Sequence, residues 1–147
     1  MTAFSSTAYT VNPPTAGHGL AENIKVAAAS VAVPNTLAAN DTVNLFYLPA
    51  GATVRRASLR ASPALDSNGS PTLTLDVGDA GNTARLFSQS LAGSSASGDD
   101  GVCAFVGLGY QYPVKTAIFA TVHAAGATKV AGTISLTVFY TVDGMPS

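Results

Sequence analysis

The chain has 147 residues, of which 47% are hydrophobic and only 10% charged, and its formal net charge is −1 at pH 7. Soluble domains usually carry about 25% charged residues, and a nucleic-acid binder needs a basic surface to neutralise phosphates, so no nucleic-acid partner is expected. No apolar run approaches the roughly 18 residues that span a bilayer, so no membrane partner is expected either. Because interface centres are depleted in charge, the low charge favours contact with other proteins.

Residues 1–23, MTAFSSTAYTVNPPTAGHGLAEN, show no sustained periodicity and contain Pro13, Pro14, Gly17 and Gly19. Proline cannot donate a backbone hydrogen bond to a sheet and keeps its predecessor extended. This segment is therefore predicted to be an N-terminal arm. Two interpretations stay open, a disordered terminus or an arm that docks on a partner. The segment lacks the charged start and apolar core of a signal peptide.

Residues 24–147 are predicted to form a single β domain, because short apolar segments with period-two alternation follow one another between turn residues. The predicted strand segments are, in chain order, IKVAAASVAV (24–33), TVNLFYL (42–48), ATVRRASLRA (52–61), TLTLDV (72–77), ARLFSQSL (84–91), VCAFVGLGYQY (102–112), VKTAIFATVHA (114–124) and GTISLTVFYTV (132–142). The last segment alternates most clearly. Its first face has Ile134, Leu136, Val138, Tyr140 and Val142, and its second has Ser135, Thr137 and Thr141.

The abundant alanines do not indicate helices, because they lie among Val, Thr, Ser and Gly rather than Glu, Lys and Leu. A short helix within residues 83–93 stays open. About eight strands at short spacing, without crossover helices, predict an all-β fold. The expected architecture is an antiparallel, jelly-roll-like β-sandwich with an extended N-terminal arm.

The strongest candidate for a chemical site is LTLDVGDAGNTARLF, residues 73–87. Asp76 and Asp79, with Asn82, could supply oxygen ligands to calcium, but the EF-hand ligand ladder and the P-loop lysine are both absent. The favoured interpretation is a β-turn in which Gly78 and Gly81 supply positive φ, while Asp79 and Asn82 bond the backbone. No cofactor and no metal are predicted, and calcium at Asp76 and Asp79 is kept as the alternative.

The sequence lacks the residue sets that enzymes use. G-x-S-x-G, H-E-x-x-H and a zinc-binding cysteine pair are all missing. Cys103 lies in an apolar run and is predicted to be a small buried hydrophobe. The single glutamate, Glu22, and His18 fall in the arm, while His123 falls on a predicted strand. We therefore expect a protein that is not an enzyme.

Three arginines, Arg55, Arg56 and Arg60, fall within six residues of one predicted strand. Arg56 and Arg60 are four residues apart and so share a strand face. One interpretation is a solvated face. The other is an interface with an acidic protein surface, because the planar guanidinium pairs with carboxylates in a bidentate way.

Two stretches, FYLPAGATVRRASLRAS (46–62) and TLTLDVGDAGNTARLF (72–87), resemble small virion structural proteins of tailed bacteriophages. That group includes capsid decoration or cement proteins and minor head proteins. The resemblance covers about residues 43–87. It implies a β-sandwich that binds the outside of an icosahedral shell at symmetry-related sites, commonly as a trimer. It assigns no functional residue.

The resulting hypothesis is a non-enzymatic capsid decoration or cement protein that stabilises an icosahedral phage head. Its expected partners are the major capsid protein and copies of itself in a homotrimer, and its expected location is the capsid surface, after synthesis in the host cytoplasm. The interface residues predicted for it are Arg55, Arg56, Arg60, Pro13 and Pro14. Two alternatives stay open: a carbohydrate- or receptor-binding module of a fibre or adhesin, with an aromatic or calcium-lined pocket, and a tail component that forms hexameric rings.

Overall fold

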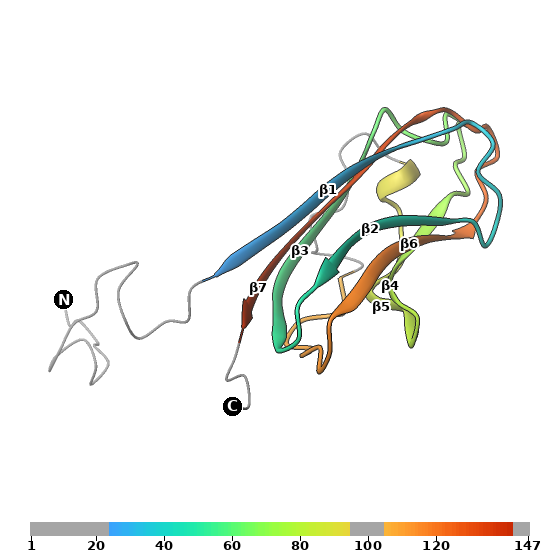
Figure 1. The fold of residues 1–147 in the computed structure, drawn as a ribbon. Helices are drawn as coiled ribbons and strands as arrows, with labels where there is room; N and C mark the ends of the chain where they lie inside the picture. The colour runs from blue at the N-terminus through green and yellow to red at the C-terminus, as the bar shows by residue number, and fades with distance from the viewer. Residues whose placement is uncertain (1–23, 95–104, 143–147) are drawn as a thin grey trace, which may run out of the picture.

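The computed structural model describes residues 24–94 and 105–142, and in these ranges seven strands form two antiparallel sheets that pack face to face (Figure 1). The strands are β1 (Lys25–Val33), β2 (Thr42–Leu48), β3 (Ala52–Ser62), β4 (Thr74–Asp79), β5 (Asn82–Ser90), β6 (Thr116–Ala124) and β7 (Gly132–Val142). The predicted antiparallel β-sandwich is confirmed. The arm with Pro13 and Pro14, and also Cys103, lie outside the described residues.

The two sheets differ in size. One has the order β1-β7-β3 and the other the order β2-β6-β4-β5. The core lies between them. On the predicted apolar face of β7, Ile134, Leu136 and Val138 are 0% exposed, whereas Tyr140 and Val142 at its end are half-buried. Leu136 pairs with Leu59 of β3, which is also 0% exposed. Each such leucine stabilises the fold by about 1.5–3 kcal/mol through burial of its side chain.

The predicted strand over residues 102–112 does not form in its described part, so the expectation of about eight strands is corrected to seven in the described ranges. Residues 105–112 make only isolated bridges, Phe105 to Phe87 and Gln111 to Thr53. Between these bridges Gly109 has a φ of 80°, which interrupts an extended strand. The segment crosses from β5 to β3 and closes one side of the sandwich.

The alternative helix within residues 83–93 is not formed. Residues 83–90 belong to β5, and residues 92 and 93 lie in the single 3-10 turn that follows it, η1 (Ala92–Ser94). No helix in the described ranges is long and apolar enough to cross a membrane.

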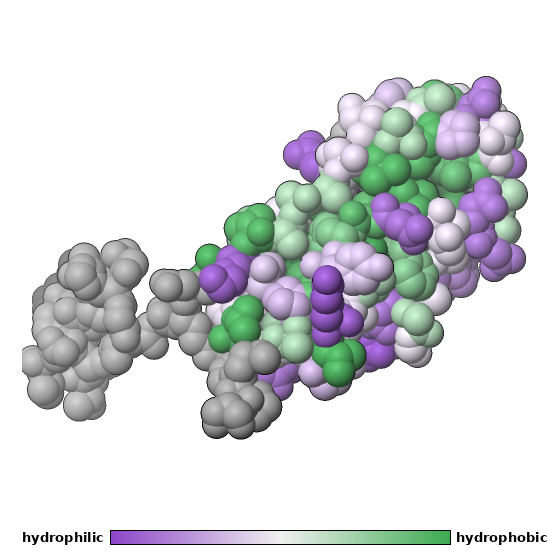
Figure 2. All heavy atoms as spheres, in the orientation of Figure 1, coloured by the Kyte–Doolittle hydropathy of each residue, from purple (hydrophilic) through white to green (hydrophobic). Residues whose placement is uncertain are grey.

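The opposite side of the sandwich is open between the edge strands β1 and β2, where the space-filling view shows hydrophobic side chains gathered along the gap (Figure 2). A groove of about 460 Å³ runs there between the end of β1 and the start of β2. Its lining residues are Val31, Ala32, Val33, Pro34, Leu37, Asp41, Thr42, Val43 and Asn44.

Candidate docking face

The outer face of the three-stranded sheet points away from the core and is built from cross-strand rows of β1, β7 and β3. These rows are Val26–Phe139–Arg56, Ala28–Thr137–Ser58, Ser30–Ser135–Arg60 and Ala32–Thr133–Ser62. Most of the side chains are small, and the Ser30 and Ser135 hydroxyls share a hydrogen bond of 2.7 Å across the strands. Between the arginines, the side chains on this face are therefore short.

All three predicted arginines are exposed on β3. Arg56 and Arg60 lie on the same outer face, as their spacing predicts, and their Cα atoms are separated by about 13 Å. Arg55 is the extra residue of a β-bulge between Val54 and Arg56, and its Nε donates to Thr141 Oγ1 at 3.1 Å. Within the described part of the chain, Arg56 and Arg60 have no hydrogen bond or ion pair from their side chains.

Charge is distributed unevenly between the two sheets. The strands of the three-stranded sheet contain Lys25, Arg55, Arg56 and Arg60, four of the chain's seven Lys and Arg residues, and no carboxylate. Lys25 shares a cross-strand row with Tyr140 and the buried Val54, so it lies on the opposite face from Arg56 and Arg60. The four-stranded sheet holds two aspartates of β4. Although the net charge of the chain is only −1, the outer face of the three-stranded sheet is therefore basic.

An apolar pair lies next to Arg56 at one end of this face. Val26 is 55% exposed and pairs across the strands with Phe139, which in turn pairs with Arg56. Sequence reasoning missed Val26 and Phe139 as surface residues. The sequence shows that both residues alternate with inward-facing ones. It does not show that they lie next to each other, because that depends on the order of the strands in the sheet.

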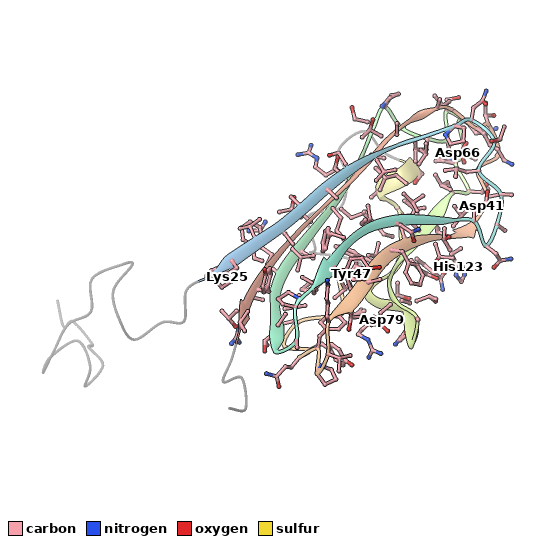
Figure 3. The ribbon with its side chains drawn as sticks, viewed as in Figure 1. Lys25, Asp41, Tyr47, Asp66, Asp79 and His123 are labelled. Atoms are coloured by element: carbon pink, nitrogen blue, oxygen red, sulfur yellow. The ribbon has the colours of Figure 1, made fainter. Side chains whose placement is uncertain are left out.

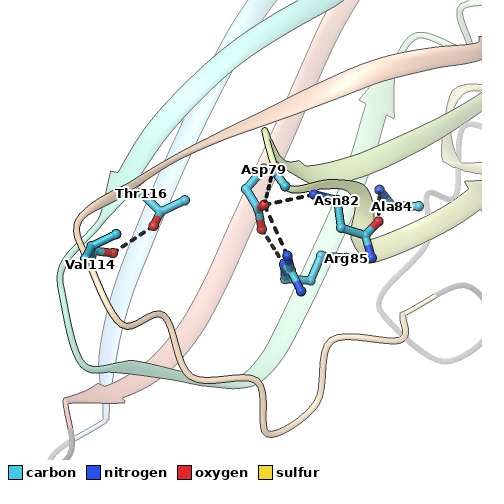
Figure 4. A network of polar contacts seen from close by, with 7 residues as sticks. Asp79, Asn82, Ala84, Arg85, Val114 and Thr116 are labelled. Carbon is cyan, nitrogen blue, oxygen red and sulfur yellow. Dashed lines mark hydrogen bonds and ion pairs between the residues drawn. The ribbon is translucent and has the colours of Figure 1, made fainter.

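The stretch that looked most like a site, residues 73–87, forms the β4–β5 hairpin, with its turn at Ala80 and Gly81. Asp79 accepts hydrogen bonds from the amides of Gly81 at 2.8 Å and Asn82 at 3.0 Å, and its carboxylate is ion-paired with Arg85 (Figure 4). Burial raises the pKa of Asp79, but the hydrogen bonds from Arg85, Asn82 and Gly81 outweigh it and leave the pKa below its ordinary value. The predicted turn is confirmed.

One detail of that prediction is wrong, because neither Gly78 nor Gly81 is among the described glycines with positive φ, which are Gly51 and Gly109. Gly78 is needed instead for a close approach of two backbones. A Cβ at this position would lie 2.2 Å from the carbonyl oxygen of Asn82.

Asp76 has different partners from Asp79. Its Oδ2 lies 2.9 Å from His123 Nδ1, and its Oδ1 accepts the amide of Gln89 at 2.7 Å. Figure 3 shows His123 and Asp79 at separate places on the four-stranded sheet. In residues 24–94 and 105–142, no three His, Cys, Asp or Glu side chains are grouped so that they could hold a metal ion. The two aspartates proposed as calcium ligands thus serve two separate protein contacts.

The comparison that decides the family is with a chain of the cyanophage Pam1 capsid asymmetric unit. The two chains are 33% identical, with a TM-score of 0.74, over 97% of this chain and 99% of that one. The chain belongs to this family of phage capsid-associated proteins. The resemblance to phage virion proteins that residues 43–87 carry is thereby confirmed.

Two further capsid structures share the fold of this capsid-associated protein. A chain of the Ralstonia phage GP4 capsid is 23% identical, with a TM-score of 0.67, over 94% of this chain and 97% of that one. A chain of the acid-stable capsid of Helicobacter pylori bacteriophage KHP30 is 22% identical, with a TM-score of 0.53, over 86% and 95%. Neither a protein-family model nor a curated protein matches the chain.

The capsid-associated protein also contains a buried carboxylate in the loop that follows β3. Asp66 is 2% exposed and accepts five backbone amides. Its donors are Asn68, Thr72, Leu73, Ala127 and Thr128. Asp66 thus joins the loop after β3 to the loop after β6, at the end of the sandwich far from Lys25 (Figure 3).

Proposed function

We propose that this capsid-associated protein is a decoration or cement protein that binds the outside of an icosahedral phage head and stabilises it. The observation that carries the proposal is the similarity to a Pam1 capsid chain, which extends over 97% of this chain. Its role is structural and non-enzymatic, and its partners are the major capsid protein and further copies of itself in a homotrimer.

The described surface supports this role. The basic face has small side chains between its two outer arginines, and the two described aspartates of the four-stranded sheet are engaged within the fold. Many equivalent contacts over a shell give a high avidity even where each interface is small. A sandwich with one basic face suits a protein that occupies repeated sites.

The proposed organisation is one β domain, residues 24–147, preceded by an arm, residues 1–23, that adds contacts to the shell or to adjacent copies through Pro13 and Pro14. Deleting residues 1–23 tests the arm, and we expect a lower occupancy of capsids at equal protein concentration. An occupancy equal to that of the full chain would remove the arm from the proposal.

The central experiment mixes the purified full chain with bare heads of its phage and measures co-sedimentation and the temperature at which the heads break open. We expect saturable binding at symmetry-related sites and a higher disruption temperature, and light scattering should give the mass of a trimer. Binding to tails, with hexameric rings, would favour the tail component instead. Binding to a glycan array without binding to heads would favour the fibre or adhesin module.

A further inference from the structure

We propose that the outer face of the three-stranded sheet is the docking face, and that it binds an acidic protein surface of the shell. Arg56, next to the apolar pair Val26 and Phe139, is its anchor, and Arg60 supplies the second charged contact. This inference rests on the proposed function and names the surface and the partner chemistry for it.

The first reason to expect an acidic partner is the charge of this face. The strands of this sheet contain no carboxylate, and their outer face carries Arg56 and Arg60. Arg56 and Arg60 have no side-chain hydrogen bond or ion pair in the described part of the chain. Unpaired cations on one face attract a partner of opposite charge and fix its orientation. A partner with carboxylates at about the 13 Å spacing of these two residues would match them both.

The second reason is the small size of the side chains between the arginines. Ser58 lies between Arg56 and Arg60 on this face, Thr137 lies beside Ser58, and Ser135 lies beside Arg60. Such short side chains let a partner surface come close, so that each planar guanidinium can reach a carboxylate with two parallel hydrogen bonds. Arginine makes this fork and lysine does not, so the residue type also matters.

The third reason is the apolar pair, Val26 and Phe139, beside Arg56. Arginine and aromatic side chains, phenylalanine among them, are enriched in protein interfaces, whose centres are more apolar than the rim. Val26, Phe139 and Arg56 form a row across three strands, with Val26 55% exposed. The expected partner therefore has an apolar surface directly beside one of its carboxylates.

The described part of a second copy fits this face poorly. Among the described carboxylates only Asp41 is exposed, while Asp66, Asp76 and Asp79 are buried and hydrogen-bonded. A second copy thus offers one exposed carboxylate in its described part, where the face presents two unpaired arginines.

The test compares the dissociation constants of full-length variants for bare heads at low and high salt. Arg56→Ala/Arg60→Ala should weaken binding at low salt by about tenfold or more and should flatten the salt dependence. The matched control, Lys115→Ala/Lys129→Ala, removes the same charge from outside the sheet and should stay within about twofold. Melting curves should coincide for all variants, since the four side chains are exposed.

Two more variants separate the contributions of arginine geometry and of the apolar contact. Arg56→Lys/Arg60→Lys keeps the charge but not the fork, so its affinity should lie between those of the wild type and the alanine variant. Val26→Ser should weaken binding equally at both salt concentrations, because it removes an apolar contact.

The outcomes distinguish the inference from the function on which it rests. If the wild type binds heads and the double alanine variant binds equally well, the docking face is refuted and the proposed function stands. If the double variant lowers the mass by light scattering without changing the affinity for heads, the face joins copies of the protein and the inference is overturned. If the wild type does not bind heads, the proposed function fails.

Discussion

Replacing Asp66 by asparagine should destabilise the fold severely, because one carboxylate serves five backbone donors in a site that is 2% exposed. Oδ2 accepts the amides of Thr72, Leu73 and Ala127, and Oδ1 accepts those of Asn68 and Thr128. Asparagine has one oxygen and one NH₂ group. In either orientation its NH₂ faces at least two amide donors, which then remain buried without an acceptor.

The size of the effect follows from the lost hydrogen bonds. A hydrogen bond to a charged group contributes about 1.5–3 kcal/mol, so two lost bonds lower the free energy of unfolding by about 3–6 kcal/mol. Domains of this size are stable by only about 5–15 kcal/mol. Asp66→Asn should therefore unfold at a much lower urea concentration, measured by circular dichroism at fixed protein concentration.

Asp41→Asn is the matched control. Asp41 is exposed and accepts one amide, that of Ala38, at 2.8 Å. The same change should therefore cost about 1 kcal/mol or less. If Asp66→Asn shifts the urea midpoint no more than Asp41→Asn does, the reasoning about the buried carboxylate is wrong.

The dependence on pH gives an independent check. Burial raises the pKa of Asp66, but the amides of Thr128, Thr72, Ala127 and Asn68 lower it by more, so the folded pKa lies well below the ordinary 3.8. A carboxyl group with a lowered folded pKa stabilises the protein above its unfolded pKa, and this stabilisation is lost as the pH falls towards the folded value. The difference between wild type and Asp66→Asn should thus be full at pH 7 and smaller at pH 3.

The β4–β5 hairpin supplies three further predictions, each measured by urea or thermal unfolding. Arg85→Ala leaves the buried Asp79 without its cation and should lower the free energy of unfolding by about 3 kcal/mol. Gly78→Ala should lower it by about 1–3 kcal/mol, because the new Cβ meets the carbonyl oxygen of Asn82 at 2.2 Å. Its control, Gly69→Ala, meets nothing within 4 Å and should change it by less than about 0.5 kcal/mol. Calcium or a chelator should leave the melting temperature unchanged, since the Asp79 carboxylate is bound by Arg85 and two backbone amides; a clear shift with calcium would restore the calcium alternative.

The features that sequence reasoning predicted well are local ones. Side chains alternate along any strand, so the inward face of β7 and the shared face of Arg56 and Arg60 followed from spacing alone. The hairpin turn also followed, because Asp79 and Asn82 bond amides only two or three residues away.

The features that it missed depend on contacts distant in sequence or on small irregularities. Two of the donors to Asp66, Ala127 and Thr128, are 61 and 62 residues away along the chain, so no local pattern distinguishes Asp66 from an ordinary turn aspartate. The bulge at Arg55 adds one residue to β3 without a marker in the sequence. The φ of Gly109 breaks a segment whose composition favours a strand.

The docking face combines both kinds of feature, which explains why the sequence indicated it only in part. The spacing of Arg56 and Arg60 is local, whereas the row Val26–Phe139–Arg56 exists only because β7 lies between β1 and β3. Placing β7 in the centre puts the apolar pair beside an arginine and leaves the whole face without a carboxylate. A chain with a net charge of −1 can therefore present one basic face with an apolar contact at its end. That combination suits selective binding to an acidic protein surface better than general attraction to polyanions, because general attraction would need a higher positive charge over the whole molecule.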